Sequence, residues 1–173
     1  MHYINAGIDS GDISGKTRFL VDPDETGFRL YLRAMHSAAD FLMKSFDDLI
    51  HGKLGRQPQK GYGSYYNELP RRYHIDWSQS REGIKRQVRV HAKPNIPAYT
   101  YLLNHAIFIN KVSHYNARKT AAHGSGYIVK VFPDKRFVMA CADGWLLVED
   151  YDIYPELKGV PFKLHFAKGA RLE

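Results

Sequence analysis

Five short runs rich in β-branched and aromatic residues constrain the fold of this chain most. They cover residues 99–103, 106–113, 126–132, 137–142 and 144–151. Residues that favour turns separate them, among them Gly124, Pro133-Asp134 and Asp143-Gly144. Short strands at this spacing are typical of a small antiparallel barrel. We therefore predict an OB-like β-barrel domain over residues 98–173, which the segment from Pro155 to the end helps to close.

Two helices are predicted before this domain. Over residues 26–50 apolar side chains recur every three or four positions, a pattern that predicts an amphipathic helix whose apolar stripe lies in a core. The stripe consists of Phe28, Leu32, Met35, Ala39, Leu42, Phe46 and Leu49. Gly52 suits the position just after a helix. The second helix begins after Ser80, a favourable N-cap, and ends before Pro94.

The segment before the first helix is predicted to form a strand, a glycine turn and a second strand over residues 3–21. Asp9 lies in the turn between Gly7 and Gly11. A carboxylate on a glycine-flanked turn is exposed where the backbone approaches a ligand closely, although an isolated Asp in such a turn is more often structural. Residues 53–97 are predicted to be a basic linker followed by the second helix.

Positive charge is concentrated in the middle of the chain. The net charge is +7, and residues 51–130 carry fourteen basic and three acidic side chains. Arg81, Lys85 and Arg89 recur every four residues on one helix face, which is tolerable where that face is solvated or binds an anion such as phosphate, a nucleotide-linked sugar or RNA. Tyr62, Tyr65 and Tyr66 could stack a base or sugar, but we favour their anchoring the linker.

Composition excludes several classes of protein. The single cysteine, Cys141, excludes a disulfide framework, and we expect a buried thiol and a reducing compartment such as the cytoplasm. No apolar run is long enough to span a membrane, and the first residues do not have the pattern of a signal peptide. The nine histidines show no metal-binding spacing, and no nucleotide-binding or serine-hydrolase motif occurs. No metal site is expected.

Four blocks occur in order along the chain: Gly7-Ile8-Asp9-Ser10-Gly11-Asp12-Ile13, then Pro23-Asp24-Glu25-Thr26 with the long helix, then Ile75-Asp76-Trp77-Ser78-Gln79-Ser80, and finally Asp143-Gly144-Trp145-Leu146. In this order they resemble the folate-dependent formyltransferases, the family of methionyl-tRNA formyltransferase and the sugar-amine N-formyltransferases. The resemblance covers nearly the whole chain.

The resemblance implies an α+β fold in which residues 1–52 are the C-terminal piece of a Rossmann-like catalytic domain. It implies that Asp9 is catalytic, that Gly7 and Ile8 line the pterin pocket, and that 10-formyltetrahydrofolate donates a formyl group to a primary amine. The family's Asn and His, in an N-x-H-P-S type segment, have no counterpart here. We therefore expect the C-terminal half of a formyltransferase, incomplete alone and completed by a separate upstream half or a homodimer covering helix 26–50.

The segment after the second helix bears on which amine is the acceptor. Methionyl-tRNA enzymes of the family carry a Pro-Trp-Pro-like segment there, whereas this chain has Lys93-Pro94-Asn95-Ile96-Pro97-Ala98. This departure favours a sugar amine or another small molecule over methionyl-tRNA. The alternative function is a non-catalytic OB-like module that binds RNA or another anionic ligand through Arg81, Lys85 and Arg89.

Overall fold

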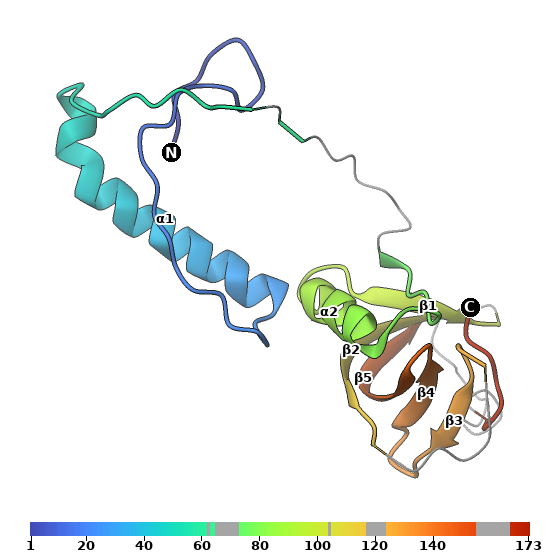
Figure 1. The fold of residues 1–173 in the computed structure, drawn as a ribbon. Coiled ribbons are helices and arrows are strands. Elements are labelled where there is room, and N and C mark those ends of the chain that lie inside the picture. The colour runs from blue at the N-terminus through green and yellow to red at the C-terminus, as the bar shows by residue number, and fades with distance from the viewer. Residues whose placement is uncertain (62, 65–72, 104, 117–123, 155–166) are drawn as a thin grey trace. The chain divides into compact units, whose positions relative to one another are not determined.

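The fold is taken from a computed structural model that describes residues 1–61, 63–64, 73–103, 105–116, 124–154 and 167–173. Tyr62, Tyr65 and Tyr66 of the linker and the start of the closing segment at Pro155 lie outside these residues. The chain divides into two compact units, here called unit 1 (residues 1–25 and 29–67) and unit 2 (residues 26–28 and 68–173). Figure 1 shows the helices and strands of both units.

Unit 2 is built on a five-stranded antiparallel sheet in the order β1-β2-β5-β4-β3. Its strands are β1 (Ala98–Leu102), β2 (His105–His114), β3 (Ile128–Val131), β4 (Phe137–Cys141) and β5 (Gly144–Tyr154). The five predicted strands are thus confirmed, with ends shifted by up to three residues. Register shifts in β2 between Ile109 and Val112 mark a bulge, which bends the long β2–β5 pair.

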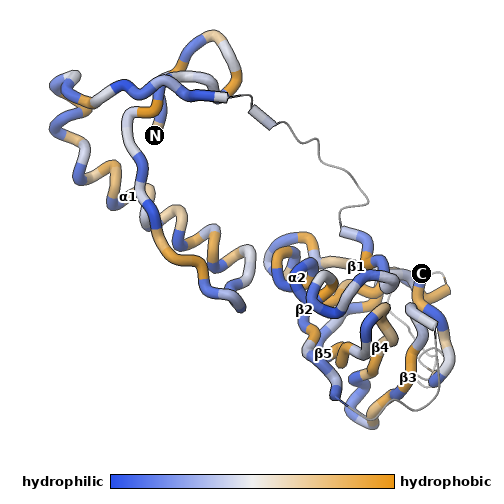
Figure 2. The backbone as a smooth tube through the Cα atoms, viewed as in Figure 1, coloured by the Kyte–Doolittle hydropathy of each residue, from blue (hydrophilic) through white to orange (hydrophobic). Residues whose placement is uncertain are grey.

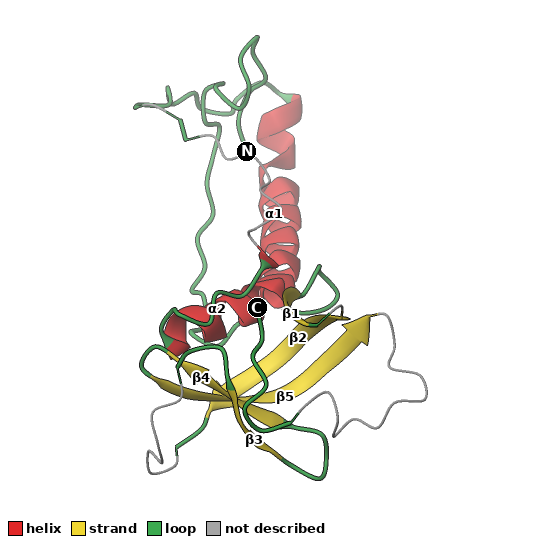
Figure 3. Ribbon diagram, turned by 90° about the vertical axis from the view of Figure 1, so that its right-hand side faces the viewer, coloured by secondary structure: helices red, strands yellow, loops and turns green. Residues whose placement is uncertain are grey.

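The core of unit 2 lies between this sheet and helix α2 (Arg81–His91), which packs chiefly against β2 (Figure 3). Ile84 and Val88, one turn apart on α2, are buried. Ser80 caps the helix as predicted, because its Oγ accepts a hydrogen bond from the Gly83 N–H at 3.2 Å. Every residue of β4 is buried, including Cys141, and this burial raises the pKa of its thiol to about 12.

The last residues of the chain bond to both edges of the sheet. The backbone of Glu173 exchanges hydrogen bonds with Tyr101 of β1 at 2.7 and 2.9 Å. Ala170 and Leu172 bond to Ile128 and Gly126, at the start of β3 and just before it. Leu172 is itself buried in the core. These bonds connect the two edge strands through the C-terminal segment.

Unit 1 contains helix α1 (Gly27–Ile50) except its first two residues, and the predicted end of this helix is confirmed. Gly52 has a φ of +65°, and the Lys53 and Gly52 N–H groups donate to the carbonyls of Asp48 and Leu49, which is the Schellman arrangement. The two strands predicted within residues 3–21 are wrong: residues 3–4 belong to no strand, and residues 13–21 run along α1 instead. Two hydrogen bonds join this segment to α1: Ser37 donates to the Thr17 hydroxyl, and Arg33 donates to the Leu20 carbonyl. Ile13 forms isolated β-bridges with His2 and Gln57, but among the described residues these bridges do not extend into a ladder.

The apolar stripe of α1 differs from expectation. Figure 2 shows apolar and polar residues alternating along the helix, as the sequence pattern requires. No residue of α1 is buried, however, and Met35 and Phe46 are 53% and 49% exposed. The pattern correctly predicts an apolar face, but the described part of unit 1 holds no sheet on which that face could pack. No described helix is long and apolar enough to cross a membrane.

Candidate active-site loop

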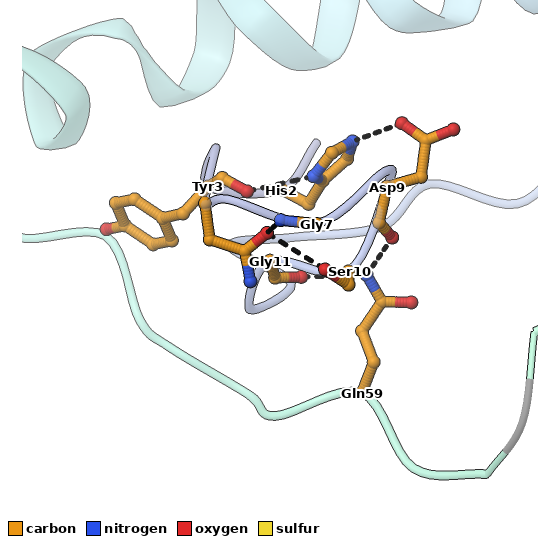
Figure 4. Close-up of polar contacts among 8 residues, drawn as sticks. His2, Tyr3, Gly7, Asp9, Ser10, Gly11 and Gln59 are labelled. Carbon is orange, nitrogen blue, oxygen red and sulfur yellow. Dashed lines mark hydrogen bonds and ion pairs between the residues drawn. The ribbon is translucent and has the colours of Figure 1, made fainter.

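The loop over residues 5–13 is held from two sides (Figure 4). From within, the Asn5 side-chain oxygen accepts hydrogen bonds from the Gly7 N–H at 3.1 Å and the Ser10 hydroxyl at 2.9 Å. From outside, the Gln59 side-chain nitrogen donates to the carbonyl oxygens of Asp9 and Gly11, at 2.8 and 2.7 Å. The loop is therefore fixed through its backbone.

Glycine is required at one position of this loop. A Cβ atom added to Gly11 would lie 1.7 Å from the Tyr3 carbonyl oxygen, well inside contact distance. Tyr3 and Asp12 are also joined, since the Tyr3 N–H donates to the Asp12 carbonyl at 2.8 Å. The two arms of the loop thus cross closely, and Gly11 is the residue that permits it.

Asp9 lies at the tip of this loop with a φ of +51°, a left-handed conformation that Asp tolerates better than most residues. Its side chain is 86% exposed. The nearest imidazole is His2, whose Nε2 is 3.6 Å from Asp9 Oδ1 (Figure 4). Ile8, beside it, is 77% exposed. The loop therefore presents a carboxylate and an apolar side chain together.

The segment after α1 forms the scaffold of the loop. The sequence predicts a linker here, but Gln57 and Ile13 exchange two backbone hydrogen bonds at 2.8 and 3.0 Å. The Tyr3 hydroxyl donates to the Leu54 carbonyl, and the Arg56 guanidinium lies 3.8 Å from the centre of the Tyr3 ring. Sequence reasoning missed Gln59 and its neighbours, because their partners are about fifty positions away. Asn5 gave a local signal, since Asn two residues before a Gly often forms an Asx turn.

The remaining candidate residues lie in unit 2, on α2. Arg81 is the first residue of the helix, and its N–H donates to the Asp143 carboxylate at 2.8 Å. The Arg81 Nε is 3.5 Å from the same carboxylate oxygen. A Cβ atom at Gly144, where φ is +152°, would lie 2.8 Å from that Nε. Lys85 and Arg89 are half-buried on the same helix.

Two of the sequence blocks therefore meet in unit 2 for structural reasons. Asp143 adds a second cap to α2 beside Ser80, because its carboxylate accepts the Arg81 N–H bond, and Gly144 leaves room for Arg81. The Trp77 Nε1–H donates to the buried Thr100 hydroxyl at 3.0 Å, while Asp76 accepts bonds from the Ser78 N–H and hydroxyl.

Among the described residues, no group of three or more His, Cys, Asp or Glu side chains could hold a metal ion.

The cap at Asp143 predicts a pH effect. The hydrogen bond from the Arg81 N–H holds the pKa of the Asp143 carboxyl below its ordinary 3.8. A lowered folded-state pKa stabilises the fold above pH 3.8, and this contribution is lost as the pH falls through the lower value. We expect Asp143→Asn to lower the urea midpoint of unit 2 at pH 7, and we expect this difference from wild type to shrink as the pH is lowered below 3.8.

Trp77 and Trp145, both in unit 2, report this transition by fluorescence. Asp40→Asn, which changes an exposed carboxylate on α1, is the matched control and should leave the midpoint of unit 2 unchanged. An Asp143→Asn midpoint equal to wild type at pH 7 would contradict a stabilising role of the Asp143 charge, since the Asn side-chain oxygen still accepts the Arg81 N–H bond.

Comparison with known proteins identifies the class of domain to which unit 2 belongs. Residues 70–154 match the family described as formyl transferase, C-terminal domain. Methionyl-tRNA formyltransferase of Alkaliphilus metalliredigens (strain QYMF) is 31% identical over 155 residues, which are 85% of this chain and 46% of that protein. The matches span between 33% and 52% of the length of the curated relatives.

Two solved structures have a similar fold. HypX from Aquifex aeolicus in complex with tetrahydrofolic acid has a TM-score of 0.64 at 13% identity, over 85% of this chain and 25% of that chain. The N-formyltransferase from Helicobacter canadensis in complex with folinic acid and dTDP-3-aminofucose has a TM-score of 0.59 at 19% identity, over 87% of this chain and 54% of that chain.

The five-stranded sheet with α2 packed on it defines unit 2 as a C-terminal domain of the formyltransferase type. The chain belongs to the formyltransferase family and corresponds to the C-terminal part of its members. The resemblance carried by the four sequence blocks is thereby confirmed.

Proposed function

We propose that this chain takes part in moving a formyl group from 10-formyltetrahydrofolate to a primary amine, with Asp9 as the catalytic carboxylate. The observation that carries the proposal is the Asp9 loop, which holds an exposed carboxylate on a fixed backbone in a member of the formyltransferase family. Tetrahydrofolic acid and folinic acid in the two similar structures support a folate-type donor.

The chemistry requires a proton acceptor beside the amine. Attack of the amine nitrogen on the formyl carbon forms a C–N bond and leaves a positive nitrogen and a negative oxygen. The nitrogen loses a proton, the bond from the formyl carbon to the folate nitrogen breaks, and that folate nitrogen takes up a proton. A carboxylate such as Asp9 can accept and pass on this proton. The family's Asn and His partners, which would stabilise the oxyanion, match no segment of this sequence.

Gly7 and Ile8 are the proposed contacts to the pterin. The exposed Ile8 side chain and the small surface at Gly7 suit the flat face of an aromatic ring. Folate when bound would supply the activated formyl group, while these residues and Gln59 position it and Asp9.

Arg81, Lys85 and Arg89 are the proposed contacts to an anionic acceptor, with Arg81 already paired to Asp143. The segment Lys93 to Ala98, which lacks the Trp, favours a sugar amine such as that of the Helicobacter canadensis complex. The curated relatives are methionyl-tRNA formyltransferases, which favours methionyl-tRNA. Both acceptors carry a primary amine and phosphate, so the same residues suit either.

The proposed function also implies a domain type for each part of the chain. Residues 98–173 form an OB-like barrel, supported by the bonds of the C-terminal segment to both sheet edges. Residues 1–52 are part of a Rossmann-like catalytic domain, joined by residues 53–97. The exposed stripe of α1 is then the face that a further half of that domain, or a second copy of the chain, covers.

A formyl-transfer assay tests the proposal. The chain is mixed with a polypeptide carrying the part of the Alkaliphilus metalliredigens relative that it does not match, with labelled 10-formyltetrahydrofolate, and with either methionyl-tRNA or dTDP-3-aminofucose. We expect labelled acceptor only when both polypeptides are present, and the labelled acceptor identifies the substrate class. Absence of transfer to both acceptors, with both polypeptides folded by circular dichroism, overturns the proposal. RNA retention by such an inactive mixture would favour the binding-module alternative.

A further inference from the structure

The Gln59 side chain makes two hydrogen bonds from one nitrogen to the tip of the Asp9 loop. Its Nε2 donates to the Asp9 carbonyl at 2.8 Å and to the Gly11 carbonyl at 2.7 Å, from 50 and 48 positions away in the sequence (Figure 4). A primary amide has two N–H bonds on one nitrogen, so it can satisfy two carbonyls that face the same point.

These bonds bear on the conformation of Asp9. A non-glycine residue at φ +51° is held in a sparsely populated region, which the surrounding structure must stabilise. Gln59 binds the carbonyls on either side of Ser10, and thus fixes the peptide that follows Asp9. The carboxylate itself is not used in these bonds and stays 86% exposed.

Gln59 is in turn fixed by the segment that carries it. The Schellman cap at Gly52 ends α1, and Gln57 then pairs with Ile13 through its backbone at 2.8 and 3.0 Å. The side chain of Gln59 therefore starts from a backbone already tied to the far arm of the same loop. Hydrogen bonds at Gly52, Gln57 and Gln59 therefore fix this segment at successive points between the end of α1 and the tip that bears Asp9.

We propose that Gln59 is a positioning residue for formyl transfer, which holds the Asp9 carboxylate in its reactive orientation through the Asp9 and Gly11 carbonyls. This inference rests on the proposed function of Asp9. A displacement of about 1 Å in a catalytic group can reduce the rate roughly a hundredfold, so loss of the two bonds should act on turnover. Binding of the folate, through Gly7 and Ile8, should change much less.

The discriminating variant is Gln59→Glu, because an ionised carboxylate has the same size as the amide but cannot donate a hydrogen bond. The matched control is Gln57→Glu, which adds the same charge two residues away, where contact with the loop runs through the backbone. Both are made in the full chain.

The first readout is nuclear magnetic resonance of the ¹⁵N-labelled chain, which needs no activity. In the wild type the Gln59 side-chain NH₂ protons should exchange with solvent more slowly than those of Gln57. Gln59→Glu should shift the backbone amide signals of residues 7–12, whereas Gln57→Glu should not. Lowering the pH to about 4, near the ordinary glutamate pKa, should return the signals toward wild type, because a protonated carboxyl can donate again.

The second readout is formyl transfer by the assembled pair of polypeptides. Gln59→Glu should lower kcat by about 10- to 100-fold and leave the KM for 10-formyltetrahydrofolate within about threefold. Equal amide signals and equal kcat in the two variants would overturn the positioning role. A wild-type pair without activity would instead reject the proposed function, and fast exchange of the wild-type Gln59 NH₂ protons would reject the positioning role without any variant.

Discussion

Replacement of Asp9 by Asn is expected to lower kcat for formyl transfer by about 10²- to 10⁴-fold in the assembled pair of polypeptides. This range is the usual contribution of a general acid or base. The amide keeps the shape of the carboxylate but cannot accept the proton that the attacking amine must lose. The loop should keep its conformation, because Asn5 and Gln59 hold it through the backbone and not through the Asp9 carboxylate.

Single-turnover assays with 10-formyltetrahydrofolate measure this effect apart from folate binding. Asp12→Asn is the matched control, since Asp12 lies in the same loop and its carboxylate is 3.9 Å from Arg56. We expect its rate to stay within about threefold of wild type. Full activity of Asp9→Asn would remove Asp9 from the mechanism, and an equal loss in both variants would assign the effect to the loop as a whole.

The second large effect is expected in the core of unit 2. Phe137 in β4 is completely buried, and its ring meets that of Tyr151 edge to face at 5.1 Å. Truncation of a buried Phe to Ala costs about 3–5 kcal/mol through lost burial and the cavity left behind. Because whole domains are stable by only about 5–15 kcal/mol, Phe137→Ala should bring unit 2 close to unfolding at 25 °C.

Urea unfolding followed by the fluorescence of Trp77 and Trp145 measures this loss. Phe46→Ala makes the same chemical change on α1, where the side chain is 49% exposed, and should alter the unfolding free energy of unit 2 by less than about 0.5 kcal/mol. A loss below about 1 kcal/mol in Phe137→Ala would mean that β4 is not the centre of the core.

The predictable parts of this fold are those encoded by neighbouring residues. Runs of strand-forming residues separated by turn residues predict all five strands, and Ser80 and Gly52 predict helix ends. Each of these signals lies within a few residues of the feature that it predicts. The segment over residues 13–21 fails as a strand, since a strand also requires a partner that periodicity does not reveal. The α1 stripe likewise shows an apolar face without specifying what covers it.

The candidate site divides in the same way. The glycine turn makes Asp9 a recognisable candidate, and the resemblance gives it a role. Nothing local in the sequence indicates that Gln59 bonds to the loop, because that contact forms only when the chain returns after α1. The Asp143-Gly144 block was recognisable as a motif, whereas its role as a second cap of α2 required the structure.

The C-terminal segment has a consequence for the behaviour of the protein in solution. Exposed edge strands present unpaired backbone groups to which other molecules can add a strand, and proteins commonly cover such edges. Here Glu173 occupies backbone groups of β1, while Ala170 and Leu172 occupy groups at the start of β3. We therefore expect that the same few residues that join the two edges also limit the addition of strands from other molecules to unit 2.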